Sequence, residues 1–317
     1  MQSVWTEKYR PSTFEQVKGQ KRILERIQAM VNQKNLQNML FCGPAGVGKS
    51  TLAVVIAREL FGENWKFNFH ELNASDARGI DVVRNDIKQF ARTKAIGTEL
   101  PKIIFLDECD ALTKEAQQAL RRTMENYSKT VRFVLSCNFF SKILDPIKSR
   151  CTIFKFKPLE KGDVEKVVFN LAEKEGLNVS KETIDALYDV CEGDARRIVN
   201  ILQSCAMMDK NISTEHVFEF MAMAKPEEIK SFLIKAINKD FINAKKEMQK
   251  VMIQHSLSGM DLIKQIQKEI WSLEIDDNLK IKLIDKCGEI EFRMVEGSDE
   301  FIQLEALLAN FANAHVD

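Results

Sequence analysis

Apolar and polar positions follow two patterns in the first half of the chain, which are short apolar runs and segments with helical spacing. Four short apolar runs, each ending in polar residues or glycine, are typical of buried strands in a parallel sheet. They are MLFC (39–42), KIIFLDECD (102–110), VRFVLSCN (131–138) and TIFKFKPL (152–159). Helical spacing fills the segments between them, as in EAQQALRRTMENYS (115–128). Alternating strands and helices predict an α/β domain whose parallel sheet is covered on both faces.

After Pro158 the pattern becomes helical only. Residues 160–224 carry about three helical segments, and a break at KPEE (225–228) starts another helical region. We therefore predict three domains, which are an α/β domain over 1–159, a small all-helical domain over 160–225 and a second all-helical domain over 226–317. In the last domain Ile263, Ile266 and Ile270 follow helical spacing. Such apolar stripes form a core by default, and they also suit packing against neighbouring chains.

Composition is that of a globular intracellular protein. Of 317 residues, 45% are apolar and 29% are charged, and no apolar run reaches the length of a membrane span. The start, MQSVWTEKYR, lacks the apolar core of a signal peptide. Seven cysteines without CxxC spacing and four scattered histidines favour a reducing compartment and no structural zinc. We expect the cytoplasm of an archaeon, or the nucleus if the source is eukaryotic.

Charge is unevenly divided although the net charge is zero. Residues 1–160 hold 26 lysines and arginines against 17 aspartates and glutamates, a charge of +9, and the remainder carries −9. A basic half can meet a polyanion such as nucleic acid. Chance segregation of solvated faces is the alternative interpretation.

GPAGVGKS (43–50) fits the phosphate-binding loop pattern GxxxxGK[ST], follows an apolar run and opens a helix. Backbone N–H groups of such a loop surround a phosphate at a helix N-terminus. The loop residues are Gly43, Pro44, Ala45, Gly46, Val47 and Gly48. Lys49 would reach the β- and γ-phosphates, and the Ser50 hydroxyl would ligate Mg²⁺. The cofactors predicted are ATP and Mg²⁺.

Two acids and an amide follow neighbouring strands. After IIFL, the Asp107 carboxylate can hold Mg²⁺ and Glu108 can polarise the attacking water. Asn138 ends the next strand along the chain, and its amide suits positioning that water near the γ-phosphate. An ordinary turn residue at a strand end is the alternative for Asn138.

Phosphoryl transfer also needs positive charge as the γ-phosphoryl group departs. Arg196, in GDARR on the helical segment, can fold over the nucleotide. Arg150, in DPIKSRC at the far edge of the predicted sheet, cannot reach its own site but can reach that of a neighbour. A solvated arginine at a strand edge is the alternative for Arg150.

A basic stripe follows the helix expected to start near residues 79–81. Arg84, Lys88 and Arg92 lie four residues apart, while Val83, Ile87 and Phe90 point elsewhere, toward a core. The stripe is either a DNA-binding surface or a solvated basic face.

The chain resembles the AAA+ clamp-loader ATPases, and within them the small subunit of archaeal and eukaryotic replication factor C. The motifs that carry this resemblance are WTEKYRP (5–11), VKGQ (17–20), GPAGVGKST (43–51), ELNASDARGIDVVR (71–84), FLDECDAL (105–112), ALRRTMENYS (119–128), SCN (136–138), DPIKSRC (145–151) and GDARRIVN (193–200). They cover about residues 1–205. Residues 226–317 fit the collar domain of this family by length and helicity.

The resemblance implies a role for each matching residue. Lys49, Ser50 and Thr51 match the phosphate and Mg²⁺ ligands, and Glu108 matches the catalytic carboxylate of the Walker B pair. Asn138 matches sensor 1, and Arg196 matches sensor 2 on a helical lid over 160–225. Arg150 matches the arginine finger given to the ATP of the adjacent subunit. The segments that wrap the base in similar proteins contain Val4, Tyr9, Arg10 and Val17.

The resemblance also implies partners. They are a large clamp-loader subunit and further small subunits in a pentamer, a ring-shaped sliding clamp and primer–template DNA, with no membrane. The basic stripe is then expected to touch DNA phosphates, Ala91–Gly97 to contact the clamp, and either Arg121 or Arg122 to couple DNA to Glu108. Two alternatives stay open, which are another AAA+ DNA-remodelling ATPase and a mainly structural ATP-binding subunit.

Overall fold

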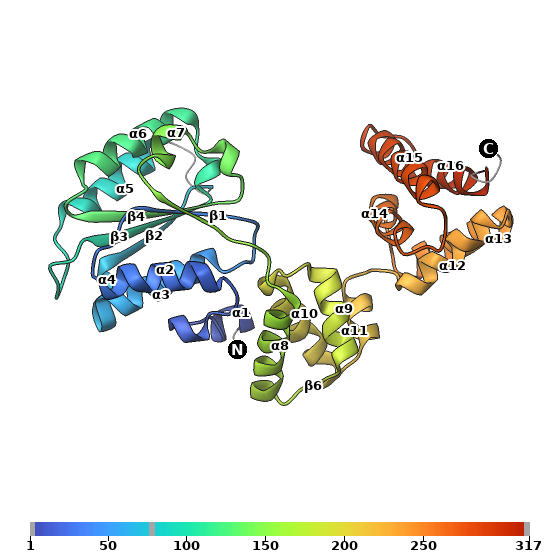
Figure 1. Ribbon diagram of the computed structural model, residues 1–317, viewed down its shortest axis with the longest axis horizontal. Helices are drawn as coiled ribbons and strands as arrows, with labels where there is room; N and C mark the ends of the chain where they lie inside the picture. The colour runs from blue at the N-terminus through green and yellow to red at the C-terminus, as the bar shows by residue number, and fades with distance from the viewer. Residues whose placement is uncertain (1–3, 76–79, 314–317) are drawn as a thin grey trace. The chain divides into compact units, whose positions relative to one another are not determined.

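The computed structural model of the chain describes residues 4–75 and 80–313, the side chains of residues 80–85 excepted (Figure 1). The chain divides into two compact units, one ending at Ile212 and the other beginning at Ser213. The predicted domain boundaries at 159/160 and 225/226 stay predictions. In the described part of the chain, no helix combines the length and apolar character needed to cross a membrane.

The first unit is built on a five-stranded parallel sheet in the order β2-β3-β4-β1-β5. Its strands are β1 (Met39–Cys42), β2 (Phe69–Asn73), β3 (Lys102–Asp107), β4 (Val131–Cys137) and β5 (Thr152–Lys155). The four predicted strands are confirmed with shorter bounds. The sequence pattern did not predict β2 because FHELN, at one edge of the sheet, carries polar residues at alternate positions.

Two layers of helices cover the sheet (Figure 1). The helices of this part are α2 (Lys21–Asn32), α3 (Lys49–Phe61), α4 (Trp65–Asn68), α5 (Ile80–Arg92), α6 (Lys114–Asn126) and α7 (Asp145–Lys148). Successive strand residues point to opposite faces. Phe41 therefore packs in one core with Ile27 and Leu52, whereas Leu40 packs in the other with Leu120. Each such fully buried side chain contributes roughly 1.5–3 kcal/mol.

A helical segment completes the first unit. It contains α8 (Lys161–Glu175), α9 (Lys181–Cys191) and α10 (Ala195–Met208). Two short parallel strands, β6 (Asn178–Val179) and β7 (Asn211–Ile212), lie beside the helices that the sequence predicts here. The N-terminal α1 (Trp5–Lys8) packs against this segment, where the backbone N–H of Trp5 donates to Gln203 Oε1 at 2.9 Å.

The second unit is helical. Its helices are α11 (Thr214–Phe220), α12 (Pro226–Ile237), α13 (Phe241–Gln254), α14 (Gly259–Ile270), α15 (Asp277–Val295) and α16 (Glu300–Asn313). The expected stripe of Ile263, Ile266 and Ile270 is confirmed on α14, where all three side chains are buried in one core. Pro226 stands in the first turn of α12, the helix position at which its missing N–H costs nothing.

Candidate functional site

The phosphate-binding loop, residues 43–48, joins β1 to α3 at the carboxyl end of the sheet. Gly46 and Gly48 have φ values of +69° and +95°, which glycine adopts without a steric penalty. Helix α3 begins directly after the loop, at Lys49. The first N–H groups of a helix lack intrahelical partners and lie at the positive end of its dipole, so the loop is suited to an anion.

Lys49, the first residue of α3, is buried and is only 7% exposed. Its Nζ donates to the carbonyl oxygens of Gly43 and Pro44, both at 2.6 Å, and to Asn138 Oδ1 at 2.9 Å. Burial lowers the pKa of Lys49, and the negative charge of Asp107 opposes that shift. The ammonium group thereby joins the loop to the end of β4. The predicted roles of Lys49 and Asn138 toward ATP stay predictions.

Ser50 and Asp107 bring two oxygen ligands together. The Ser50 hydroxyl donates to Asp107 Oδ2 at 2.8 Å. Mg²⁺ prefers hard oxygen ligands and usually takes only one or two carboxylates from the protein, with phosphates and waters completing its shell. The donor set therefore fits the predicted magnesium site.

Asp107, Glu108 and Asp110 follow β3, and the two aspartates accept hydrogen bonds from backbone N–H groups near the site. Glu108 is exposed and has φ +51° and ψ +37°, a left-handed conformation that costs a non-glycine residue of order 1–3 kcal/mol. Asp107 Oδ1 accepts the Glu108 N–H at 2.9 Å. Asp110 accepts the N–H groups of Asn138 and Phe139 at 3.3 and 3.1 Å. The site motifs did not mark Asp110, which ties the loop after β3 to Asn138.

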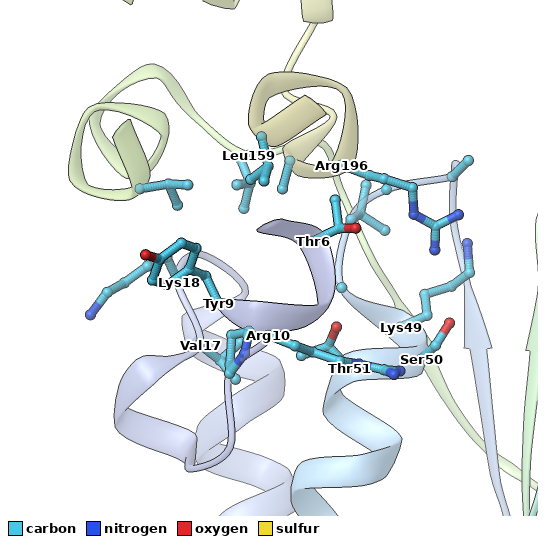
Figure 2. A pocket seen from close by; sticks show the side chains of 18 of the residues that line it. Thr6, Tyr9, Arg10, Val17, Lys18, Lys49, Ser50, Thr51, Leu159 and Arg196 are labelled. Atoms are coloured by element: carbon cyan, nitrogen blue, oxygen red, sulfur yellow. The ribbon is translucent and has the colours of Figure 1, made fainter. Parts of the chain in front are cut away.

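The start of α10 contacts the phosphate-binding loop directly. The Ala195 N–H donates to the Gly46 carbonyl at 3.1 Å, and Asp194 caps the helix by accepting the Arg197 N–H at 3.0 Å. A side chain at position 46 would overlap the Asp194 carboxylate. Arg196 lines the same cavity (Figure 2). The sequence motifs single out Arg196 but not Asp194, whose position just before a helix is nevertheless a capping signal.

Gly46→Ala is expected to destabilise the ligand-free chain by about 1–3 kcal/mol more than Gly48→Ala. Both positions have positive φ, but a Cβ at Gly48 meets nothing within 4 Å, so only Gly46→Ala must displace Asp194. Thermal unfolding without nucleotide measures the difference. Equal shifts of the melting temperature for Gly46→Ala and Gly48→Ala would contradict a close contact between the loop and Asp194.

The loop, the acids and α10 enclose a cavity of about 290 Å³ (Figure 2). The predicted site residues that line it are Tyr9, Arg10, Val17, Ala45, Gly46, Val47, Gly48, Lys49, Ser50, Thr51, Asp107, Glu108, Asn138 and Arg196. Gly43 and Pro44 are not lining residues, although their carbonyls hold Lys49. Val4 lies outside the cavity and is 56% exposed.

Opposite the phosphate-binding loop, the wall of the cavity comes from the N-terminal segment and α8. Tyr9, Arg10 and Val17 lie on this side in Figure 2. Tyr9 and Lys8 both donate to Glu175 Oε1 at the end of α8, the lysine at 2.6 Å, and so hold the two elements together. Sequence reasoning did not predict Val167 and Leu171 of α8 in this wall. They escaped prediction because an apolar helix residue that faces a ligand follows the same sequence spacing as one that faces a core.

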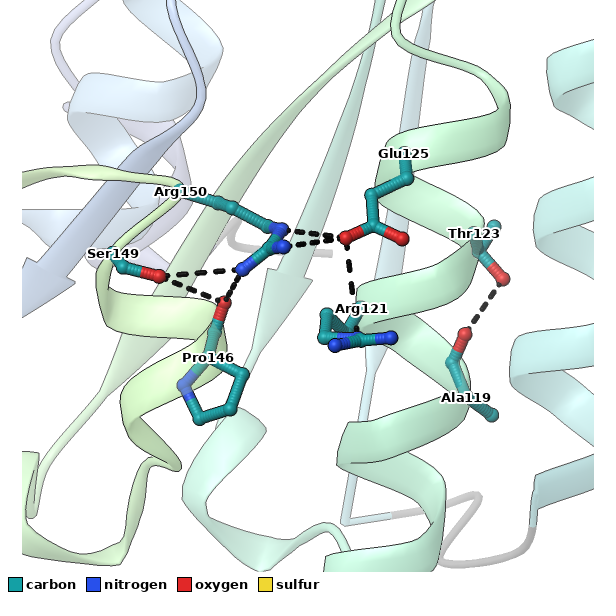
Figure 3. A network of polar contacts seen from close by, with 7 residues as sticks. All are labelled: Ala119, Arg121, Thr123, Glu125, Pro146, Ser149 and Arg150. Atoms are coloured by element: carbon teal, nitrogen blue, oxygen red, sulfur yellow. Dashed lines mark hydrogen bonds and ion pairs between the residues drawn. The ribbon is translucent and has the colours of Figure 1, made fainter.

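Arg150 is not among the residues that line the cavity. It follows α7 and precedes β5, the strand at one edge of the sheet, as predicted. Its guanidinium group forms an ion pair with Glu125 of α6 at 2.5 Å and donates to the Pro146 carbonyl at 2.7 Å (Figure 3). The structure thus places every other predicted catalytic group at one cavity and keeps Arg150 apart from it.

The predicted basic stripe falls on α5, whose start at Ile80 agrees with the expectation. Lys88 is half-buried and Arg92 is exposed, whereas the Arg84 side chain lies outside the described residues. Ile87 is buried and Phe90 packs against the same core, as predicted. None of the described stripe residues lines the nucleotide cavity.

Two family models match the chain. The model for the ATPase family associated with various cellular activities (AAA) matches residues 39–159, and the model for the replication factor C C-terminal domain matches residues 224–310. Proteins described as replication factor C small subunit match almost the whole chain. The one from Archaeoglobus fulgidus is 47% identical over 96% of this chain and 96% of its own length.

The chain belongs to the replication factor C small subunit family. Members from Methanocella arvoryzae and Methanococcus vannielii are both 49% identical and are covered over 96% and 98% of their lengths. The family and the AAA domain make this chain an ATP-binding, ATP-hydrolysing enzyme of DNA replication. The resemblance stated from its motifs is therefore confirmed.

Solved structures confirm the fold. Thermotoga maritima RuvB, described as a Holliday junction branch migration motor, has a TM-score of 0.56 with 17% identity, over 72% of this chain and 79% of that chain. A point variant of the same protein gives a TM-score of 0.57 at the same identity and coverage. At this identity the likeness establishes a shared AAA+ architecture and nothing about substrate.

Proposed function

We propose that this chain is the ATPase subunit of a clamp loader that opens a ring-shaped sliding clamp and loads it onto primer–template DNA during replication. One observation carries the proposal beyond ATP hydrolysis alone. Lys49, Glu108, Asn138 and Arg196 line one cavity, whereas Arg150, the remaining predicted catalytic residue, is held away from it by Glu125 and Pro146. An arginine finger that cannot serve its own subunit has a use only in an oligomer.

In the proposed site, the loop Gly43–Gly48 and Lys49 bind the phosphates of ATP, and Thr51 and Arg196 line the same space. Ser50 and Asp107 hold Mg²⁺, which when bound neutralises charge on the phosphate oxygens. Glu108 orients and polarises the attacking water, and Asn138 positions it near the γ-phosphate. Tyr9, Arg10 and Val17 contact the base, and Val4 belongs to the same segment.

We assign the α/β domain to residues 1–159, the lid to 160–225 and the collar, which drives assembly, to 226–317. Exposed large apolar side chains support an assembly role for the collar, because extended exposed apolar surface marks sites of protein–protein interaction. They are Ile234, Ile242, Ile253, Trp271, Ile281, Phe292, Val295, Phe301 and Ile302. The proposed assembly is a pentamer of one large clamp-loader subunit with copies of the small subunit.

DNA is proposed to contact Arg84, Lys88 and Arg92 along α5. Contacts of lysine and arginine with phosphates are independent of base sequence, and they weaken as salt rises because counterions are released.

We propose that residues 91–97 contact the sliding clamp. The main chain of Ile96 in this segment exchanges two hydrogen bonds with the buried Asn68 side chain, at 2.8 and 2.9 Å, while the Ile96 side chain is 53% exposed.

The proposed cycle starts when ATP binds at the subunit interfaces and orders a spiral that opens the clamp. Primer–template DNA enters the spiral and aligns the interfaces. Glu108 of one subunit and Arg150 of its neighbour then permit hydrolysis, and the loader releases the closed clamp. Coupling of DNA to Glu108 through Arg121 or Arg122 belongs to the same proposal.

ATP turnover by the purified chain is expected to rise several-fold when a sliding clamp and primed DNA are added together, and less with either alone. The assay is run with and without the large subunit, at two salt concentrations, because the DNA-dependent part of the increase should shrink at higher salt.

Two outcomes would contradict the proposal. ATP-driven strand displacement without any response to the clamp would indicate a translocating DNA remodeller. Binding of ATP without turnover under every condition would indicate a structural subunit.

A further inference from the structure

Arg150 is held in place on its own subunit by a set of acceptors from α6 and α7. Its Nε donates to Glu125 Oε1 at 2.9 Å, and its Nη2 lies 2.5 Å from the same oxygen. Its Nη1 donates to the Pro146 carbonyl at 2.7 Å and to Ser149 Oγ at 3.3 Å (Figure 3). These contacts come from both ends of the guanidinium group, so they restrain its position as well as offset its charge.

Glu125 also balances a second cation. Arg121, one helical turn earlier on α6, has its Nε 4.0 Å from the same Oε1 atom of Glu125. Two guanidinium groups therefore share one carboxylate, and the cluster carries a net charge of +1 (Figure 3). Without Glu125, two like charges would face each other at a partly buried site, and Arg150 would lose its contacts at Nε and Nη2.

The contacts leave part of the guanidinium group available. Arginine has five N–H donors in a rigid plane. Glu125 takes the Nε–H and one Nη2–H, and Pro146 and Ser149 take the donors of Nη1. Among the described residues no contact takes the second Nη2–H, and the Arg150 side chain is 35% exposed. Arg150 can thus stay fixed while it donates to an anion outside the subunit.

We propose that Glu125 is a positioning residue for hydrolysis at the neighbouring subunit, because it holds Arg150 in the orientation in which its free edge meets the γ-phosphate bound there. The inference rests on the proposed function, in which Arg150 serves an adjacent site. An isolated exposed ion pair would matter little. Here the pair restrains a long, flexible side chain that must be ordered before it can act.

A mixture of two variants tests the proposal on full-length chains. The acceptor is Arg150→Ala, which keeps its own nucleotide site, and the donor is Glu108→Gln, which keeps Arg150 but does not hydrolyse ATP. The mixture should turn over ATP faster than either variant alone. Adding Glu125→Ala to the donor is expected to lower kcat of the mixture about tenfold and to leave KM unchanged, because the hydrolysing subunit is not altered.

Further donors separate positioning from general damage. Glu125→Gln keeps an acceptor oxygen at the same reach but not the charge that offsets Arg121 and Arg150, so it should recover part of the lost turnover. Glu125→Asp keeps the charge but withdraws the oxygen, so it should give a smaller loss in the same direction. Glu115→Ala removes an exposed glutamate from the same helix and should change nothing. Melting temperatures of all donors show whether each is folded.

The outcomes test the role of Glu125 separately from the role of Arg150 at the neighbouring subunit. Full turnover with both the Glu125→Ala and the Glu125→Asp donors would overturn the role of Glu125 and leave Arg150 as the finger. A lack of turnover with the donor that retains Glu125 would overturn the trans role of Arg150, and the role of Glu125 with it.

Discussion

Arg150→Ala is expected to keep ATP binding and to lower ATP hydrolysis about a thousandfold, the scale on which arginine fingers act. Binding is retained because Arg150 does not line the nucleotide cavity. Hydrolysis is lost because the charge that develops on the departing γ-phosphoryl group is no longer stabilised by the neighbour. Single-turnover hydrolysis and equilibrium ATP binding, measured on the assembled loader, separate the two effects.

Lys148→Met is the matched control for this experiment. Lys148 lies on α7 two residues before Arg150, pairs with Asp145 at 3.0 Å and does not line the cavity. Its side chain is only 19% exposed and lies over the Phe140 ring, so its replacement can change stability. Hydrolysis per folded molecule is expected to stay within about twofold. Normal hydrolysis in Arg150→Ala would return Arg150 to the alternative interpretation of a solvated arginine at a strand edge.

Lys49→Ala is expected to abolish the ATPase activity that clamp and primed DNA stimulate, with a loss of roughly a hundredfold or more. The buried ammonium group is the cation of the loop, and its removal leaves three acceptors unpaired, which are two loop carbonyls and Asn138 Oδ1. Unlike Arg150→Ala, this variant should also bind ATP more weakly. Titration of ATP binding and steady-state turnover give both quantities.

Lys102→Met controls for the loss of a buried lysine. Lys102 is 3% exposed, donates to Thr93 Oγ1 and lies outside the nucleotide cavity. The variant can therefore change stability, but its unstimulated turnover per folded molecule should stay near that of the unaltered chain. Normal stimulated turnover in Lys49→Ala would refute the assignment of the phosphate-binding loop.

Much of the candidate site could be predicted because its residues follow strands that the apolar pattern reveals. Lys49, Asp107 and Asn138 each come after a buried run, and the carboxyl ends of parallel strands meet at one edge of the sheet. The two residues that link these elements escaped prediction. Asp110 accepts backbone N–H groups of a distant segment, and such a contact leaves no local pattern in the chain. Asp194 caps α10 locally, but its position beside Gly46 depends on the tertiary fold.

The amino-acid sequence by itself determined four strands of the main sheet and their alternation with helices, the phosphate-binding loop, the acids and the family, because local spacing and motif chemistry express these directly. Only the tertiary structure decided which groups share a cavity and which do not. It brings the start of α10 against Gly46 and pairs Arg150 with Glu125, 25 residues away in the chain. Pairings of this kind depend on how α6 and α7 pack on the sheet, so a charged residue read alone does not reveal its partner.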